Sequence, residues 1–333
     1  MKKIKIGYAS KLNVRETINS LNQIKVSLFA SLTERFNLTQ FDSGLVTERK
    51  LWLNDDYKLT QRAIDFDIKL KQNFGELLIS NNKWRRYFLY KNNFSIGEGV
   101  LTEFNCVRRN IEPSSTKSII YKEIGFDQIQ ENYSVEKVNT VISEIYRIIK
   151  KADKTIVNEY KELSTNHLSK SITFVKYSQL RKLYPLLNMK ERIDQFGQEH
   201  GSFVLTNFIK NQAASKDLDQ QSNDVFDFDT YVELFVYNNV IESSVSLAYA
   251  SYQVGREALK KQNIISREGW KSETDYNHLI KKNELPITIT SGLYTNAISM
   301  LILEKEHIAE VHASLWDEEF IENCEKNNID IFV

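Results

Sequence analysis

The sequence predicts an α+β fold in which helices pack on an antiparallel or mixed sheet. Two kinds of stretch indicate this class. Some carry apolar residues at every third or fourth position, as helices do, and others are short, β-branched or aromatic and bounded by polar residues, as strands are. The two kinds do not alternate one for one, as they would in a doubly wound parallel fold. With 333 residues, 41% of them hydrophobic, the chain can bury a large core.

Two long amphipathic helices are predicted first. In residues 14–36 the apolar positions fall on one helical face, and they are Val14, Ile18, Leu21, Leu28, Leu32 and Phe36. A second helix is expected to begin after Ser134, which is a favourable N-cap residue. Its buried stripe would consist of Val138, Val141, Ile142, Ile145, Ile148, Ile149 and Ala152. Both stripes are expected to pack in the core.

Strands are predicted after the second helix, at residues 171–177, 202–210, 231–237 and 244–254. In the last of them, Val245, Leu247 and Tyr249 would share one face. The other face would carry, besides Tyr252, the small residues Ser246, Ala248 and Ala250. Small side chains over a sheet leave room for a ligand, so this second face is a candidate binding surface.

Nothing in the sequence divides the chain into parts. It contains three prolines and 11 glycines and no linker or internal repeat, so residues 1–333 are expected to form a single domain. The 44 basic and 44 acidic residues cancel, which leaves no net field to attract nucleic acid or a membrane. There is no apolar run of the kind found in a secretory signal or a membrane span, so a cytoplasmic location is expected.

Several common chemistries lack their sequence signatures. The glycines never match the Walker or dinucleotide spacing, and no nucleophile elbow is present. The five histidines form no ligand pair at helical spacing, so no metal site is predicted. Cys106 and Cys324 have neither metal-ligand spacing nor a histidine nearby, and they are expected to be free thiols.

Six collinear stretches give the chain a resemblance to a known family. They are SNNKWRR at residues 80–86, FSIGEG at residues 94–99, and residues 178–185, 236–242, 284–289 and 307–316. On these stretches the chain resembles the ammonia-dependent asparagine synthetase (aspartate-ammonia ligase) family. The resemblance implies a class II aminoacyl-tRNA synthetase-like core, with an antiparallel or mixed sheet flanked by helices. It also implies a homodimer, because class II cores pair through their first motif.

The resemblance also implies a chemistry and a set of site residues. In that family ATP activates a carboxylate to an acyl-adenylate, which ammonia then attacks. By the resemblance, Arg108 is the arginine of the second motif, with a surface cation as the alternative. Arg85 stands where the family has a substrate-binding lysine, and Ser80 is expected at the same substrate site. Asp55 and Asp229 fall where carboxylates hold the substrate ammonium, and solvated turns are the alternative for both.

The departures from the family pattern fall on the ATP side. The arginine of the third motif is replaced by Ala297, a metal-binding glutamate by Ser246, and an arginine further along that strand by Gln253. An amide-bearing position becomes Glu123, and a nearby acidic position becomes Gly125. Loss of one preorganised donor to a developing oxyanion costs about 100-fold to 1000-fold in rate. Efficient adenylation by the usual route is therefore not expected.

The sequence alone thus favours a protein with a degraded adenylation site and no cofactor. It would bind an amino acid, an aminoacyl group, another small amine-bearing ligand or a protein partner, and Arg108 and Glu123 are its candidate catalytic residues. The alternative is an active ATP-dependent ligase that uses ATP and magnesium. In that case the missing positive charge would come from among Arg85, Arg86, Arg108 and Arg109. A third possibility is a regulatory subunit that pairs with an active homologue through the first helix and the segment around Gly44.

Overall fold

An eight-stranded sheet forms the centre of the structure. The computed structural model describes residues 4–5, 7–55, 57, 61–69, 74–208, 222–266 and 273–333. In spatial order the strands are β1 (Leu38–Gln40), β5 (Gly99–Val107), β6 (Ile120–Ile129), β11 (Thr288–Leu293), β10 (Ser243–Tyr252), β9 (Val232–Asn238), β8 (Ser202–Thr206) and β7 (Thr173–Lys176). The pairs β1–β5 and β7–β8 are parallel and the others are antiparallel. The predicted α+β class with a mixed sheet is therefore confirmed.

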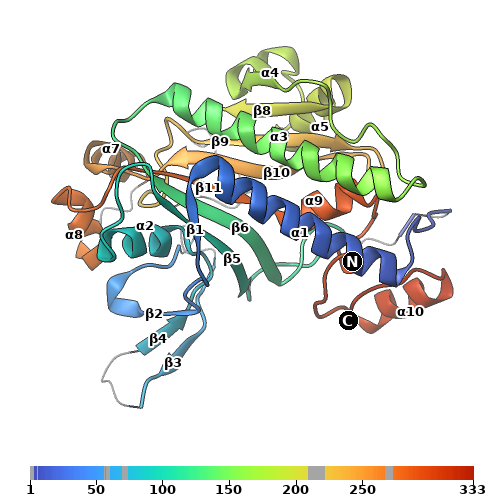
Figure 1. The fold of residues 1–333 in the computed structure, drawn as a ribbon, viewed down its shortest axis with the longest axis horizontal. Helices are drawn as coiled ribbons and strands as arrows, with labels where there is room; N and C mark the ends of the chain where they lie inside the picture. The colour runs from blue at the N-terminus through green and yellow to red at the C-terminus, as the bar shows by residue number, and fades with distance from the viewer. Residues whose placement is uncertain are drawn as a thin grey trace.

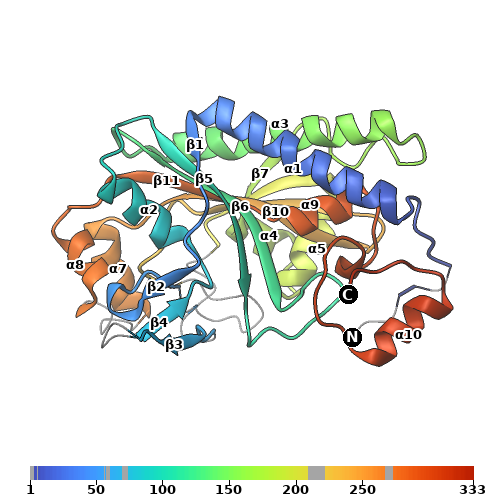
Figure 2. The same cartoon turned by 60° about the horizontal axis from the view of Figure 1, so that its bottom comes forward.

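Three helices cover one face of this sheet (Figures 1 and 2): α1 (Val14–Phe36), α3 (Val135–Glu159) and α9 (Thr295–Ile302). The first two match the predicted helices, and Ser134 caps α3 by accepting a hydrogen bond from the backbone of Lys137. The predicted stripe on α1 is wrong in its first turns, because Val14 and Ile18 are exposed. Small polar residues, Thr17 and Ser20, take the buried positions there, and the apolar pattern alone could not reveal them.

The other face of the sheet carries α2 (Asn82–Lys91) at one end and α4 (Tyr177–Leu183) and α5 (Met189–His200) at the other. Alternation along the strands divides the two faces. On β9, Leu234 and Val236 face the core beneath α3, whereas Phe235 packs with α5 residues such as Ile193 and Phe196. All four predicted strands are present as β7, β8, β9 and β10. The end of the second prediction, residues 209–210, lies outside the described residues.

The predicted faces of β10 need correction. A β-bulge between Ser246 and Ala248 interrupts the alternation. Leu247 therefore shares the helix-covered core with Ala248 and Ala250, while Tyr249 lies on the opposite face. The alanines fill core space instead of ligand space. Within the predicted small-residue face, Ser246 reaches the cleft that is described below.

Smaller elements lie at the two ends of the sheet. At one end are a three-stranded antiparallel sheet in the order β2 (Val46–Glu48), β4 (Phe74–Leu77), β3 (Asp65–Asp67), the 3-10 helix η1 (Arg49–Leu51), and the helices α7 (Arg256–Ser266) and α8 (Asp275–Lys281). At the other end are η3 (Ile308–Glu310) and α10 (Glu318–Lys326), near both termini (Figure 1). Cys106 and Cys324 are buried free thiols, as predicted. No helix in the described ranges has the length and apolar character to cross a bilayer.

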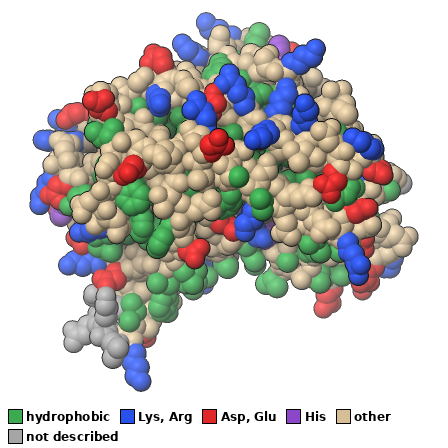
Figure 3. All heavy atoms as spheres, in the orientation of Figure 1, with side chains coloured by type: hydrophobic (Ala, Val, Ile, Leu, Met, Phe, Trp, Pro, Cys, Tyr) green, Lys and Arg blue, Asp and Glu red, His purple; other side chains and the backbone are tan. Residues whose placement is uncertain are grey.

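An apolar surface surrounds α2 and β1. Phe41, Leu45 and Ile96 are half exposed or more, and the Phe41 ring lies 4.8 Å from that of Phe88. Hydrophobic side chains gather over this region in the space-filling view (Figure 3). A Cβ at Gly44 would come within 2.5 Å of the Trp84 indole nitrogen, so glycine permits this close packing. The surface includes the segment expected to pair two subunits, and the homodimer stays a prediction.

A buried charge cluster ties α3 to the segment that follows α9. His167 Nδ1 lies 2.7 Å from Asp153 Oδ1, and its Nε2 lies 3.0 Å from Glu304 Oε1. Burial by itself would lower the pKa of His167, but the two carboxylates outweigh burial and raise it above the usual value. Burial tends to raise the pKa of Glu304, but hydrogen bonds from Lys11, Ser164 and His167 lower it to about 2. At neutral pH the cluster therefore favours a protonated imidazole between two carboxylates.

We expect His167→Asn to lower the free energy of unfolding by about 2 kcal/mol at about pH 6, because two buried carboxylates lose a charged donor. The folded-state pKa of His167 lies above its unfolded value near 6.5, so its contribution is complete below about pH 6.5 and is lost as the pH rises through the folded-state pKa. Urea unfolding should therefore show a difference between variant and wild type that narrows toward about pH 9.

The matched control for this variant is His278→Asn, which alters an exposed imidazole on α8 and should change little at either pH. A His167 difference that stays constant with pH would contradict the assigned cluster.

Candidate functional site

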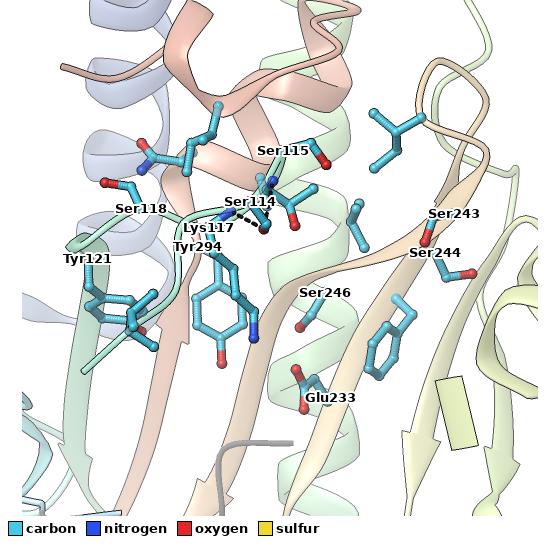
Figure 4. A pocket seen from close by; sticks show the side chains of 18 of the residues that line it. Ser114, Ser115, Lys117, Ser118, Tyr121, Glu233, Ser243, Ser244, Ser246 and Tyr294 are labelled. Atoms are coloured by element: carbon cyan, nitrogen blue, oxygen red, sulfur yellow. Dashed lines mark hydrogen bonds between the residues drawn. The ribbon is translucent and has the colours of Figure 1, made fainter. Parts of the chain in front are cut away.

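A cleft of about 810 Å³ opens on the sheet face that carries α2 and α5. Its floor consists of strand residues with the same orientation, among them Tyr121 and Glu123 on β6 and Glu233 and Phe235 on β9. Its walls come from the loop between β5 and β6, the first turn of α5 and the first turn of α9. In Figure 4 residues of the β5–β6 loop, among them Ser114 and Ser118, lie on one side of the cleft, and Ser243 and Ser244 of β10 lie on the other. Residues that are far apart in the sequence therefore meet at one site.

Arg85 lies beneath the cleft floor, fully buried, and does not line the cleft. A guanidinium has five N–H donors, and all five of its donors have acceptors here. The acceptors are Asp127 Oδ1 at 2.8 Å, Asn81 Oδ1 at 2.6 Å, Glu123 Oε1 at 3.2 Å, Thr290 Oγ1 at 3.1 Å and Asn82 Oδ1. In this arrangement no donor of Arg85 is left for a substrate carboxylate. The predicted substrate-binding role of Arg85 therefore gains no support from its position.

The charges around Arg85 are strongly coupled. Burial raises the pKa of Asp127 to about 6, although the charge and hydrogen bond of Arg85 act to lower it. Burial would lower the pKa of Arg85, but the carboxylate of Asp127 outweighs it and raises that pKa. Gln253 belongs to the same network, since its Nε2 donates to Asp127 and to the backbone oxygen of Asn82 at 2.8 Å. Gln253 thus stabilises the floor and does not face the cleft.

Glu123 connects this network to the cleft. Its carboxylate lines the cleft and accepts hydrogen bonds from Arg85, from the Tyr121 hydroxyl and, at 3.3 Å, from the Tyr249 hydroxyl. A Cβ at Gly125 would lie 2.2 Å from Arg85 Nη1 and 2.5 Å from Glu123 Oε1. Arg85, Glu123 and Gly125 therefore share one space. The guanidinium and the carboxylate occupy the volume that a side chain at position 125 would need.

Arg108 is the guanidinium that the structure brings to the cleft. Its side chain is buried, and its guanidinium carbon lies 3.6 Å from the ring centroid of Tyr121 and 4.7 Å from that of Tyr57. Arg108 Nη2 also donates to the Tyr57 hydroxyl, so the group is held in a fixed orientation on the wall. It is not the surface cation considered as the alternative. Arg86 donates to backbone oxygens away from the cleft, and Arg109 is exposed.

The other predicted substrate-binding residues lie outside the cleft lining. Asp55 is buried and accepts hydrogen bonds from the backbone of Tyr57 at 2.8 Å and from Ser222 Oγ at 2.5 Å. Ser80 is buried and accepts from the side-chain amide of Asn82. Asp229 is exposed, and its carboxylate lies 2.9 Å from the ammonium of Lys261. The position of Asp229 agrees better with the surface-turn alternative than with substrate binding.

Two positions at which the sequence lacks an expected charged residue line the cleft itself. Ala297 lines it from the first turn of α9, and Ser246 lines it from β10. The hydroxyl of Ser246 is covered and has no hydrogen-bond partner in the part of the chain that the structure describes. In the same described ranges, no three His, Cys, Asp or Glu side chains are grouped so that they could hold a metal ion.

Lys117 is a cleft residue that sequence reasoning missed. It belongs to a loop of small hydroxyl residues between β5 and β6, and it lines the cleft (Figure 4). The loop is fixed, because Ser114 Oγ accepts from the backbone of Lys117 and Ser115 O accepts from the backbone of Ile308. A hydrogen bond between Ser118 and Ser314 holds its other end. The run of Ser, Thr and Lys between two strands was the available sequence signal.

Glu233 and a set of tyrosines were also missed. Tyr231, Glu233 and Phe235 all line the cleft, as alternate residues entering and following β9 must. Tyr249 and Tyr294 line it from β10 and from the start of α9. Period-two alternation in residues 231–235 would have identified Glu233 as facing the same side as its aromatic neighbours. The tyrosine at position 249 could not be assigned to this face without knowledge of the bulge.

Solved structures with a similar fold define the class of this protein. Entamoeba histolytica asparaginyl-tRNA synthetase in complex with asparaginyl-adenylate matches with a TM-score of 0.65 and 11% identity, over 90% of this chain and 66% of that one. The asparaginyl-tRNA synthetase of Pyrococcus horikoshii complexed with asparaginyl-adenylate matches with a TM-score of 0.66 and 8% identity, over 91% and 70%. The core is therefore of the class II aminoacyl-tRNA synthetase type, as the resemblance implied.

Sequence comparison gives the family. The family model described as aspartate-ammonia ligase matches residues 15–328. The aspartate–ammonia ligase of Clostridium perfringens is 30% identical over 326 residues, which is 97% of each chain. That of Bacillus cereus is 29% identical over 98% of this chain and 100% of its own. This chain belongs to the aspartate-ammonia ligase family.

A double-mutant cycle tests the coupling around Arg85. Gly125→Ala should lower the free energy of unfolding by about 1 to 3 kcal/mol, because the added Cβ collides with a guanidinium that cannot move away. In an Arg85→Lys background the shorter side chain leaves space, so the same alanine should cost at least about 1 kcal/mol less. Urea unfolding of the four proteins gives the coupling energy.

Gly255→Ala is the control for this cycle, because a Cβ there would meet nothing within 4 Å. Its cost should be the same with Arg85 or Lys at position 85. Additive effects of the changes at positions 85 and 125 would contradict the shared-space account.

Proposed function

We propose that this protein is an ATP-dependent ligase that activates a carboxylate as an acyl-adenylate and transfers the acyl group to an amine. Aspartate or a modified amino acid is the carboxylate substrate to consider first, since the relatives are named aspartate–ammonia ligases. The observation that carries the proposal is the presence of two cations, Arg108 and Lys117, on the cleft wall. They supply positive charge in the same cleft that Ala297 lines, where the resemblance implies an arginine.

The two cations have complementary properties. Arg108 lies over the Tyr121 ring and donates to the Tyr57 hydroxyl, so its guanidinium is oriented before any phosphate arrives. Lys117 is a flexible point charge on a loop whose backbone is held by hydrogen bonds. A preorganised guanidinium and a mobile ammonium can together neutralise the triphosphate of ATP, from which pyrophosphate leaves. The sequence favoured a protein without this activity because only arginines were considered as the source of the missing positive charge. Lys117 was not included.

The described residues of the cleft do not fit a magnesium ion held mainly by protein carboxylates. Glu123 already accepts a hydrogen bond from Arg85. A second acidic ligand would be needed on β10, next to Glu233 on β9, and Ser246 occupies that position. Magnesium usually requires one or two carboxylates in addition to phosphate oxygens. In the proposed reaction Arg108 and Lys117 therefore neutralise the phosphate charge, and no step uses a metal ion.

In the proposed reaction a carboxylate oxygen of the substrate attacks the α-phosphorus of ATP. An acyl–O–P bond forms, the bond to the β-phosphate oxygen breaks, and pyrophosphate leaves. The nitrogen of a neutral amine then attacks the acyl carbon, AMP leaves with the electron pair of the acyl–O bond, and the nitrogen loses a proton. The products are an amide, AMP and pyrophosphate. Arg108 and Lys117 act in the first step, where charge accumulates on the phosphates.

ATP–pyrophosphate exchange tests the first step directly. With aspartate and a panel of other amino acids, the wild-type protein should incorporate labelled pyrophosphate into ATP. Lys117→Met should lower the exchange rate by at least about tenfold, because one cation on the phosphates is lost. Lys154→Met, on the exposed side of α3, is the matched control and should leave the rate unchanged. Absence of exchange with every carboxylate would contradict the proposal.

A second candidate function is binding of an amino acid or amine without catalysis. It is favoured by the cleft positions of Ala297 and Ser246, where charged groups are missing. In that case the wild type should show no exchange, while Ala297→Arg should gain measurable exchange by restoring one guanidinium. If the wild type shows exchange and Ala297→Arg does not increase it, the second candidate is contradicted.

A further inference from the structure

A basic and apolar surface lies around α4, which Figure 1 shows at the upper margin of the molecule. From Lys170 to Lys190 the chain carries five basic residues and no acidic one. This stretch includes the edge strand β7, the helix α4 and the loop that joins α4 to α5. The 44 basic and 44 acidic residues of the whole chain balance, so its surplus of positive charge is local. Residues 170–190 are called the basic segment below.

Large apolar side chains of the basic segment face solvent. Leu186, in the loop after α4, is 96% exposed, and Leu183, at the end of α4, is 58% exposed. Phe174 on β7 is exposed as well. Single exposed apolar residues are common on protein surfaces, but here three large ones fall within residues 174–186. Keeping this much apolar surface in water is unfavourable, so the surface has the character of a contact site.

The cations of the basic segment lie between these apolar side chains. Lys176 directly precedes α4, and Arg181 and Lys182 lie in its last turn, close to the leucines. All three are exposed. Lys190, by contrast, forms an ion pair with Asp194 on α5, with 2.7 Å between the ammonium and the carboxylate. Cations and aliphatic side chains therefore alternate over a short length of chain.

The carboxylates of the adjoining helix α5 do not cancel this charge. Residues 170–200 together carry six basic side chains and three carboxylates, and all three carboxylates belong to α5. Each of them is held by a hydrogen bond from a neighbouring group. The donors are the backbone of Asn188 to Glu191, the backbone of Ser244 to Asp194 and the Tyr184 hydroxyl to Glu199. Lys and Arg side chains also gather over the neighbouring helix α3 in the space-filling view (Figure 3).

We propose that the basic segment binds the surface of an anionic lipid bilayer. Leu183 and Leu186 enter the boundary between headgroups and acyl chains, and the cations beside them meet the lipid phosphates. Aliphatic side chains flanked by Lys and Arg are the combination that binding at a membrane interface requires. This contact lies outside the cleft and does not rest on the proposed ligase function.

Other occupants fit this surface less well. Nucleic acid would use the cations, but contact with its phosphates would give the two leucines no apolar partner. A stable protein interface buries about 800 Å² on each partner, most of it closely packed. Leu186 protrudes, since 96% of its surface is exposed, and a protruding side chain needs a soft apolar phase to enter. A bilayer supplies both that phase and the negative charge.

Co-sedimentation of the full-length protein with lipid vesicles tests the proposal. Vesicles of phosphatidylglycerol and phosphatidylcholine should bind the protein at least about tenfold more strongly than vesicles of phosphatidylcholine alone, because the cations contribute only at an anionic surface. Raising the salt from about 0.1 M to about 0.5 M should weaken the binding, since the charges are screened. No binding to the anionic vesicles, or equal binding to both kinds, would contradict the proposal.

Variants of exposed residues then locate the contact. Leu186→Ser should weaken vesicle binding by at least about fivefold, because an aliphatic side chain no longer enters the interface. Arg181→Gln combined with Lys182→Gln should weaken it by about tenfold or more. Because these side chains are exposed, both variants should unfold in urea like the wild type.

The matched controls are Leu315→Ser, which alters a leucine that is 75% exposed, and Lys260→Gln combined with Lys261→Gln on α7. Both should bind vesicles like the wild type. Vesicle binding that the double variant on α4 loses but Leu186→Ser keeps would contradict the proposal, since a site for nucleic acid or another soluble polyanion behaves in this way. A change of oligomeric state in Leu186→Ser, measured by light scattering, would also contradict it, because the leucine would then contact a second copy of the chain.

Discussion

The buried guanidinium of Arg85 is the interaction on which the rest of the site depends. It joins α2 to the middle of the sheet, because its acceptors come from Asn81, from Asp127 on β6 and from Thr290 on β11. A buried charge is stable only when it is paired and fully hydrogen-bonded, and here every donor is used. The arrangement requires a glycine at position 125. It also holds the Glu123 carboxylate of the floor, and no donor of Arg85 is left for a charged substrate.

The cleft is not uniform in charge. Arg108 and Lys117 lie on the wall formed by the β5–β6 loop, whereas Glu233 lies on the floor, on β9, with the tyrosines around it. In the proposed ligase the phosphates would bind at the wall that carries the two cations. In this account the family reaction persists with Arg108, the second-motif arginine by resemblance, and with Lys117 as an additional cation.

Sequence reasoning was reliable where a property is local and failed where it depends on contacts between distant residues. Helix periodicity and the N-cap Ser134 gave the two long helices, and the family stretches gave the fold. Alternation misassigned Tyr249, Ala248 and Ala250, because a β-bulge shifts the register by one residue and no local sequence pattern indicates it. Arg85 has no donor left for a substrate partly because it donates to Thr290, which is 205 residues away in sequence. Lys117 matches no motif and became visible only from its position in the cleft.

The most direct measurement is a crystal structure of the protein with an ATP analogue that carries a methylene bridge between the α- and β-phosphates. The account predicts phosphate oxygens within about 3.2 Å of both Arg108 and Lys117, with Arg85 still bonded to Asp127 and Glu123. Phosphates bound elsewhere in the cleft, or an Arg85 side chain that has left its carboxylates to hold the nucleotide, would contradict it.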